Sequence, residues 1–219
     1  MFEAAIFDWD GTLADTRRVV VASFQKALRD IHCEIDDDFI EKRIGIGSAE
    51  TFREILRFTK RSFDEELIKQ LVMKKIQNEI DLSADVRLFD GAIALLEQLQ
   101  GRVKLGLASM NDREVIAHML KTTGTQGFFE VVLTAADITR SKPDPEIFLK
   151  CASKLGVSSE RCVVFEDSIF GVKAAKAAEM ACIAVTTGVY SREALEKEKP
   201  DLIVGSLKES NRILGFVFQ

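Results

Sequence analysis

Short runs of apolar residues without polar alternation recur along the chain, and each ends at polar residues or a turn. The first run is Ala4 to Phe7, and it ends abruptly at Asp8. Runs of this length are typical of strands that are buried on both faces. The later runs cover residues 103–108, 131–133, 162–165 and 181–185.

Helical patterns separate these predicted strands. Asp144, Pro145 and Gly156 suit the start and the end of one of the helices, with Asp144 as its N-cap. Strand and helix in alternation predict an α/β fold with a parallel sheet and helices on both faces. The predicted helices cover residues 92–99, 113–121, 145–155 and 172–178.

Residues 14–85 interrupt the alternation with helical patterns alone. Ser62 and Glu65 form a candidate capping box for the last helix, and residues 45–47 are a predicted turn. We therefore predict a core domain of residues 1–13 and 86–219 with a helical cap domain of residues 14–85. The predicted cap helices cover residues 17–31, 37–44, 49–58 and 63–80.

Charge and composition exclude several classes of protein. The 219 residues carry a formal net charge of -5, which gives no general attraction to nucleic acid or anionic membranes. No apolar run is long enough to span a membrane, and the N-terminus lacks a basic start, so we expect a cytoplasmic protein. The four cysteines form no CxxC pair and are expected to be buried and reduced, and two isolated histidines are too few for a histidine-based metal site.

Polar residues at the ends of the apolar runs are the candidates for chemistry. Ligands of parallel sheets bind beyond the carboxyl ends of the strands, where these side chains would meet. Four carboxylates in one cleft repel each other unless a cation lies among them, and oxygen ligands without His or Cys favour Mg²⁺. The candidates are Asp8, Asp10, Ser109, Glu166 and Asp167, with Lys142 from the loop after the third run.

An ionised aspartate at such a site can attack phosphorus. Asp10 can turn back over the site because Gly11 permits a sharp turn. Lys142 would neutralise negative charge, while the hydroxyl of Ser109 and the N–H groups of Met110 and Asn111 would hold phosphate oxygens. Simpler interpretations remain open at each position: a turn at Asp8 and Asp10, a helix cap at Ser109 and Asn111, a surface lysine at Lys142.

Four stretches of the chain resemble, in order and setting, the four motifs of the haloacid dehalogenase (HAD) superfamily. The helical insert resembles the cap of that superfamily, and residues 141–145 and 165–168 resemble its phosphoglycolate phosphatase and β-phosphoglucomutase branch. The resemblance covers essentially the whole chain and implies a Rossmann-like core with an inserted α-helical cap. The stretches are Asp8-Trp9-Asp10-Gly11-Thr12, Ser109, Lys142-Pro143 and Glu166-Asp167.

The resemblance also implies a role for each residue. Asp8 would be the nucleophile that forms an aspartyl-phosphate, and Asp10 the general acid and then the base. Asp8, the backbone carbonyl of Asp10, and Asp167 would bind Mg²⁺, with Glu166 as a further ligand directly or through water. Ser109, Met110, Asn111 and Lys142 would bind the phosphoryl group, and the cap would close over a small phosphorylated metabolite.

The resemblance leaves other reactions to weigh. Phosphoglycolate is the expected substrate by family, whereas a sugar phosphomutase of the β-phosphoglucomutase type is the main alternative. Val19 to Val21 stand where that mutase has a cap histidine, which favours transfer to water. A dehalogenase would lack Asp10, and a receiver-like signalling module would lack the helical insert. Arg17, Arg43 and Arg53 could meet the substrate, although each is more typical of a solvated helix, and the oligomeric state stays open.

Overall fold

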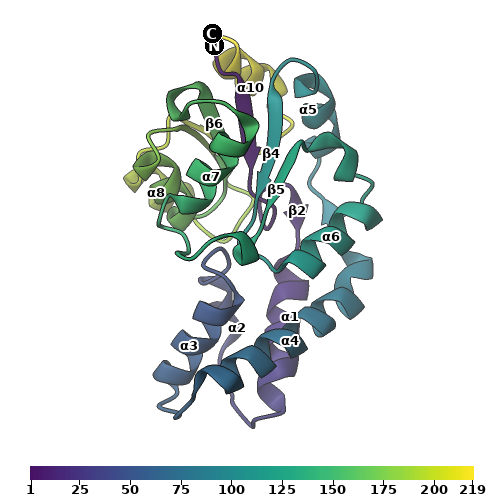
Figure 1. Cartoon of the computed structure of the whole chain (residues 1–219), viewed down its shortest axis with the longest axis vertical. Helices are drawn as coiled ribbons and strands as arrows, with labels where there is room; N and C mark the ends of the chain where they lie inside the picture. Colours follow the sequence, from purple (N-terminus) through teal and green to yellow (C-terminus); the bar gives the residue numbers. More distant parts are fainter.

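The computed structural model describes residues 1–219 and has two parts (Figure 1). A sheet flanked by helices forms one part, and both termini lie together at its far end. Four helices form the other part, beyond the opposite end of the sheet. They are α1 (Arg17–Arg29), α2 (Asp37–Glu41), α3 (Ser48–Phe58) and α4 (Glu65–Leu82).

The main sheet has six strands, and every neighbouring pair is parallel. Their spatial order is β5-β4-β1-β6-β7-β8, with β1 in the interior of the sheet. This arrangement confirms the predicted α/β fold with a parallel sheet. The strands are β1 (Ala4–Phe7), β4 (Lys104–Ala108), β5 (Val131–Leu133), β6 (Cys162–Glu166), β7 (Ala181–Val185) and β8 (Leu202–Val204).

Helices cover both faces of the sheet, and strand residues alternate between them. Ala5 and Phe7 belong to one buried cluster, while Ala4 and Ile6 belong to the other. The first cluster includes residues of α5 (Ala92–Leu99), α6 (Arg113–Thr122) and α10 (Ser210–Val217). The second includes residues of α7 (Glu146–Leu155), α8 (Ile169–Ala177) and α9 (Arg192–Lys197). Burial on both faces explains the continuous apolar runs.

The four inserted helices have an apolar core of their own. Val20, Phe24, Phe52, Ile55 and Leu71 belong to a buried cluster that contains no residue of the sheet. The chain runs from the core into the inserted helices and back again through two short strands, which pair as an antiparallel ribbon. They are β2 (Ala14–Asp15) and β3 (Arg87–Leu88). The division into two domains at residues 13/14 and 85/86 stays a prediction.

Several local predictions need correction. The N-cap of α4 is Asp64, whose side chain accepts a hydrogen bond from the N–H of Leu67 at 2.8 Å, so the capping box of Ser62 and Glu65 is wrong. Helix α7 begins at Glu146, after Pro145 as its N-cap, and not at Pro145 after Asp144. Strand β8 (Leu202–Val204) and helices α9 and α10 are not among the predicted elements. Short 3₁₀ turns occupy Ser83–Asp85, Gln126–Phe128, Ala135–Asp137 and Ser159–Arg161.

Two expectations drawn from composition can be compared with the structure. All four cysteines are buried and unpaired, as predicted. None of the helices combines the length and the apolar character that a membrane crossing requires. The remaining question is therefore what the polar edge of the sheet can do.

Candidate active site

The candidate residues meet at the carboxyl edge of the sheet. Phe7 of β1 lies in register with Leu107 of β4 and Phe165 of β6. The residues that follow these positions therefore leave the sheet at one level, and Asp8 comes directly after β1. The structure brings Asp8, Asp10, Ser109, Lys142, Glu166 and Asp167 together as buried polar residues.

Lys142 is the cation at the centre of the site. Its Nζ donates hydrogen bonds to Oδ1 of Asp8 at 2.7 Å, Oε1 of Glu166 at 2.6 Å and the carbonyl of Ala108 at 3.1 Å. Burial alone would lower the pKa of Lys142, but the two carboxylates outweigh it and raise the pKa above its ordinary value. The ammonium therefore stays charged and holds Asp8 in one orientation.

Three carboxylates gather closely enough to share one cation. Oxygen atoms of Asp8, Glu166 and Asp167 lie within 4.8 Å of one another. Burial raises the pKa of Asp8 and of Asp167, and the neighbouring carboxylates add to the rise. A group of buried carboxylates without His or Cys has the donor chemistry that Mg²⁺ prefers.

Glycines shape the space around Asp167. A Cβ atom at Gly11 or at Gly188 would overlap the Asp167 carboxyl group, so only glycine leaves room for it at either position. Thr12 donates a hydrogen bond to Oδ1 of Asp167 at 3.0 Å, which fixes one of its oxygens. Asp167 is thus held in a fitted cradle, and its place beside Asp8 suits a role as a metal ligand.

Glu166 uses both of its oxygens within the protein. Oε1 accepts from Lys142, and Oε2 accepts from the N–H of Asp167 at 3.0 Å and from the N–H and hydroxyl of Ser168 at 3.1 and 3.0 Å. These bonds orient Lys142 and the turn that carries Asp167. Direct ligation of a metal by Glu166 would compete with them, so contact through water fits this arrangement better.

Gly171 gives a test of the position of Glu166. An alanine Cβ there would overlap the Glu166 carboxyl group, and Gly171 lies within α8, where the backbone has little freedom to shift. We expect Gly171→Ala to lower the free energy of unfolding by about 3 kcal/mol, because it displaces a partner of the buried Lys142. Urea unfolding measures this effect. The matched control is Gly215→Ala in α10, where a Cβ meets nothing within 4 Å, and equal losses in both variants would contradict the prediction.

Asp10 lies in a separate network on the side of the inserted helices. Its Oδ1 accepts from the hydroxyl of Thr16 at 2.6 Å, and its Oδ2 accepts more weakly from Asn111 Nδ2 at 3.3 Å and Ser109 Oγ at 3.5 Å. Burial raises the pKa of Asp10, although the bond from Thr16 opposes the rise. A carboxyl group with a raised pKa can carry a proton for a leaving oxygen near neutral pH.

The loop after β4 differs in detail from the expectation. Helix α6 begins only at Arg113, so Ser109 and Asn111 do not cap it. The N–H of Asn111 donates to Ser109 Oγ at 3.0 Å, within the loop. Ser109 and Met110 are buried beside the carboxylates. Ser109, Met110 and Asn111 are therefore buried in one loop, and their binding of phosphate stays a prediction. The Asn111 N–H would have to exchange its partner to bind a phosphate oxygen.

Sequence reasoning missed two buried charged residues of α4. Lys75 is 2% exposed, donates to Asn111 Oδ1 at 2.8 Å and forms ion pairs with Glu79 and with Asp112, the latter at 3.5 Å. Glu79 accepts from Asn111 Nδ2 at 2.7 Å. Their spacing of four residues is that of a common surface ion pair, so the sequence carried no signal for burial. Thr16 was missed as well.

Comparisons with known proteins agree with this arrangement. The family described as "Haloacid dehalogenase-like hydrolase" matches residues 5–185. A validoxylamine A 7'-phosphate phosphatase from Streptomyces hygroscopicus subsp. limoneus is 32% identical over 211 residues, which cover 95% of this chain and 96% of that protein.

Two solved structures resemble the fold over nearly all of this chain. A hydrolase from Pseudomonas syringae has a TM-score of 0.91 at 25% identity, covering 99% of this chain and 100% of the other. A β-phosphoglucomutase from Clostridium difficile has a TM-score of 0.84 at 28% identity, covering 98% and 100%. The shared architecture extends over both the sheet and the inserted helices.

Proposed function

The chain belongs to the haloacid dehalogenase-like hydrolase family, and on that premise we propose that it is a magnesium-dependent phosphatase of small phosphorylated metabolites. Asp8 takes the phosphoryl group as an aspartyl-phosphate and passes it to water. The observation that carries this proposal is the contact of a fully buried ammonium, Lys142, with Asp8 at 2.7 Å. Such a contact orients a nucleophile and offers positive charge to the group that it receives.

Each protein group has a separate task in the reaction. Lys142 keeps the Asp8 carboxylate oriented and, with the Ser109 hydroxyl and the loop at Met110 and Asn111, binds the phosphoryl oxygens. The Asp10 carboxyl group gives its proton to the leaving oxygen and then takes one from the attacking water. Thr16 holds Asp10 in position for both transfers by its 2.6 Å hydrogen bond.

Asp8, Asp167 and the backbone carbonyl of Asp10 are the groups that would hold Mg²⁺, with Glu166 orienting the site and reaching the ion through water. When bound, the ion neutralises the gathered carboxylates and the charge of the phosphoryl group. Residues 14–85 act as the cap that closes over the substrate and excludes bulk water. The cytoplasmic location stays a prediction.

The substrate is a small phosphate ester, and two specific possibilities can be tested. Phosphoglycolate is the substrate expected from the family resemblance, and the relative from Streptomyces is named as a phosphatase of validoxylamine A 7'-phosphate. The sugar phosphomutase alternative is supported by the likeness to a β-phosphoglucomutase at 28% identity. A phosphatase releases inorganic phosphate, whereas a mutase isomerises a sugar phosphate and depends on a bisphosphate activator.

Metal removal tests the proposed cofactor. We expect the protein to release phosphate from p-nitrophenyl phosphate with Mg²⁺ present, and EDTA to abolish the release, because the site then lacks the charge that balances its carboxylates. Added Mg²⁺ should restore the rate, and the bound ion should also raise the thermal midpoint by mass action. Full turnover in EDTA, with no metal detected in the protein, would contradict a metal-dependent reaction.

A further inference from the structure

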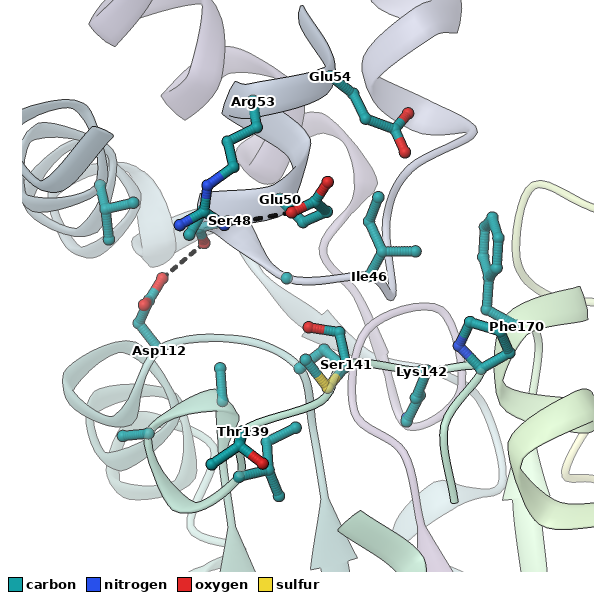
Figure 2. Close-up of a pocket in the computed structure, with 18 residues that line it drawn as sticks. Ile46, Ser48, Glu50, Arg53, Glu54, Asp112, Thr139, Ser141, Lys142 and Phe170 are labelled. Carbon is teal, nitrogen blue, oxygen red and sulfur yellow. Dashed lines mark hydrogen bonds and ion pairs between the residues drawn. The ribbon is translucent and has the colours of Figure 1, made fainter. Parts of the chain in front are cut away.

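A cavity of about 640 Å³ lies between the inserted helices and the core, and it adjoins the proposed phosphate site (Figure 2). Met110 and Lys142, which the proposed function assigns to the phosphoryl group, both line it. Figure 2 shows Ser48, Glu50, Arg53 and Glu54 entering from the insert, opposite Asp112, Thr139 and Ser141 of the core.

The space next to Asp10 itself is much smaller. It measures about 30 Å³, which is room for about one water molecule. Gly47, Ser48 and Met110 line both spaces, and a Cβ at Gly47 would come within 3.2 Å of Met110 Cε. A leaving group of several atoms cannot fit in this small space. We place it beyond this boundary in the larger cavity, because Met110 and Lys142, the residues assigned to the phosphoryl group, both line that cavity.

The charged side chains that line the larger cavity all have partners of opposite charge. Its charged lining residues are the carboxylates Glu50, Glu54 and Asp112 and the cations Arg53 and Lys142. Lys142 is already bound to two carboxylates at the catalytic centre. Arg53 is paired with Glu50 at 3.2 Å and also with a second carboxylate, and Lys142 is assigned to the phosphoryl group, so neither cation is free to pair with the leaving group. Asp112 is fixed toward the insert by a 2.6 Å hydrogen bond from Ser48.

The other arginines that could meet a substrate are occupied too. Arg43 pairs with Glu54, donates to the carbonyl of Phe39 at 2.8 Å and stacks on that ring. Arg17 pairs with Glu41. The carboxylates that line the cavity are paired in turn: Glu50 with Arg53 and Arg57, Glu54 with Arg43, and Asp112 with Lys75. The cavity therefore presents hydroxyl groups but no unpaired charge of either sign.

We propose that the leaving group of the natural substrate is a neutral hydroxylated alcohol, which carries no carboxylate, no second phosphate and no ammonium group. This inference rests on the proposed phosphatase function. A charged leaving group of either sign would find no unpaired partner in the cavity, and burying a charge without a partner costs free energy. Ser48, Thr139 and Ser141 offer hydrogen bonds to hydroxyl groups of such a ligand.

A second cavity, of about 440 Å³, provides the internal control. It also adjoins Asp10 and Asp167, and its lining includes Arg18, which forms no ion pair. Neither Lys142 nor Met110 lines this second cavity. If the leaving group occupied this second cavity, Arg18 and not Asp112 would determine which terminal charge of the ester is preferred.

Three two-carbon esters that differ in terminal charge test the inference: phosphoglycolate, hydroxyethyl phosphate and aminoethyl phosphate. Each is measured as a substrate and as a competitive inhibitor of p-nitrophenyl phosphate hydrolysis, so that a ranking is obtained even for slow turnover. We expect the neutral ester to exceed both charged esters by about tenfold or more in kcat/KM, or in affinity as an inhibitor. A preference for phosphoglycolate or for aminoethyl phosphate would overturn the inference.

Variants then show which cavity sets the preference among the esters. The ratio of kcat/KM for two esters is compared between variants, because the difference in intrinsic reactivity of the esters cancels in that comparison. Asp112→Asn keeps an acceptor for Ser48 but removes a negative charge from the cavity, and it should narrow the ratio between hydroxyethyl phosphate and phosphoglycolate severalfold. Arg18→Gln should leave that ratio unchanged, and the opposite pattern would place the leaving group in the second cavity and overturn the inference. Hydrolysis of p-nitrophenyl phosphate that depends on Asp8 shows that the phosphatase proposal stands whichever ranking is found.

Discussion

Replacing Asp8 by asparagine is expected to lower kcat for phosphate release by roughly 10⁴-fold or more, because the amide is a poor nucleophile and no second carboxylate takes its place. The change is nearly isosteric, and the amide oxygen of the new side chain can still accept a hydrogen bond from Lys142. Steady-state release of phosphate from p-nitrophenyl phosphate with Mg²⁺ measures the loss. Circular dichroism and urea unfolding show whether the fold is retained.

An exposed aspartate provides the matched control for this result. Asp38 on α2 pairs with Lys42 at the surface, so Asp38→Asn should leave the rate unchanged. Rapid quenching of the unaltered enzyme with labelled substrate should also trap label on Asp8, which peptide mapping can locate. Wild-type turnover by Asp8→Asn, or label trapped on another residue, would remove Asp8 from the mechanism.

Removing the charge of Lys142 is expected to damage stability and activity together. Lys142→Met keeps most of the side-chain length but leaves Asp8 and Glu166 buried without a cationic partner. Breaking a buried ion pair in this way costs about 3–5 kcal/mol. We expect a loss of that size in urea unfolding without metal, together with a large fall in kcat, since the nucleophile is no longer oriented.

The pH dependence of this loss has a definite sign. Burial raises the pKa of Asp8 in the folded protein, and Lys142 opposes that rise. Without the ammonium, the folded-state pKa lies further above the unfolded value, so the protonated carboxyl favours folding at low pH. That contribution is lost as the pH rises through the folded-state pKa, and the deficit should be smaller at about pH 5 than at about pH 8.

A surface ion pair of the same chemistry serves as the control for Lys142. Lys176 and Asp201 lie 2.7 Å apart, and each side chain is more than a third exposed. Such pairs contribute about 1 kcal/mol or less, so Lys176→Met should have a small effect at either pH. Equal losses from the two lysine variants would show that Lys142 is not the central cation of the site.

The two charge networks of the site differ in whether they include residues of the inserted helices. Lys142, Glu166 and Asp167 come entirely from the sheet side and are held there by backbone and side-chain bonds. The Asp10 network is instead completed by Lys75 and Glu79 of α4, which both bond to Asn111 of the core. Movement of the inserted helices away from the core would therefore break the contacts around Asp10, the proposed proton donor, and leave Asp8, the proposed nucleophile, in place.

The sequence by itself determined the parallel sheet and the residues at its carboxyl edge. In a repeated strand–helix unit, a strand buried on both faces is a local apolar run, and the residue that ends it lies at the edge where ligands bind. The positions of Asp8 and Asp167 follow from their own neighbours in the chain. The sequence predicts Lys142 as a site residue because its loop follows the third apolar run. The contacts of Lys142 with both carboxylates are known only from the structure.

The tertiary structure alone decided which ordinary charged residues become buried and which stay at the surface. Lys75 and Glu79 have the spacing of a solvated helix pair, and Ser48 and Asp112 are 64 residues apart yet bond at 2.6 Å. Strand β8 lies at the edge of the sheet and is assigned by its pairing with β7, a contact that only the folded chain makes. Contacts between the insert and the core depend on how two separately packed units meet, and no local pattern of either unit encodes that geometry.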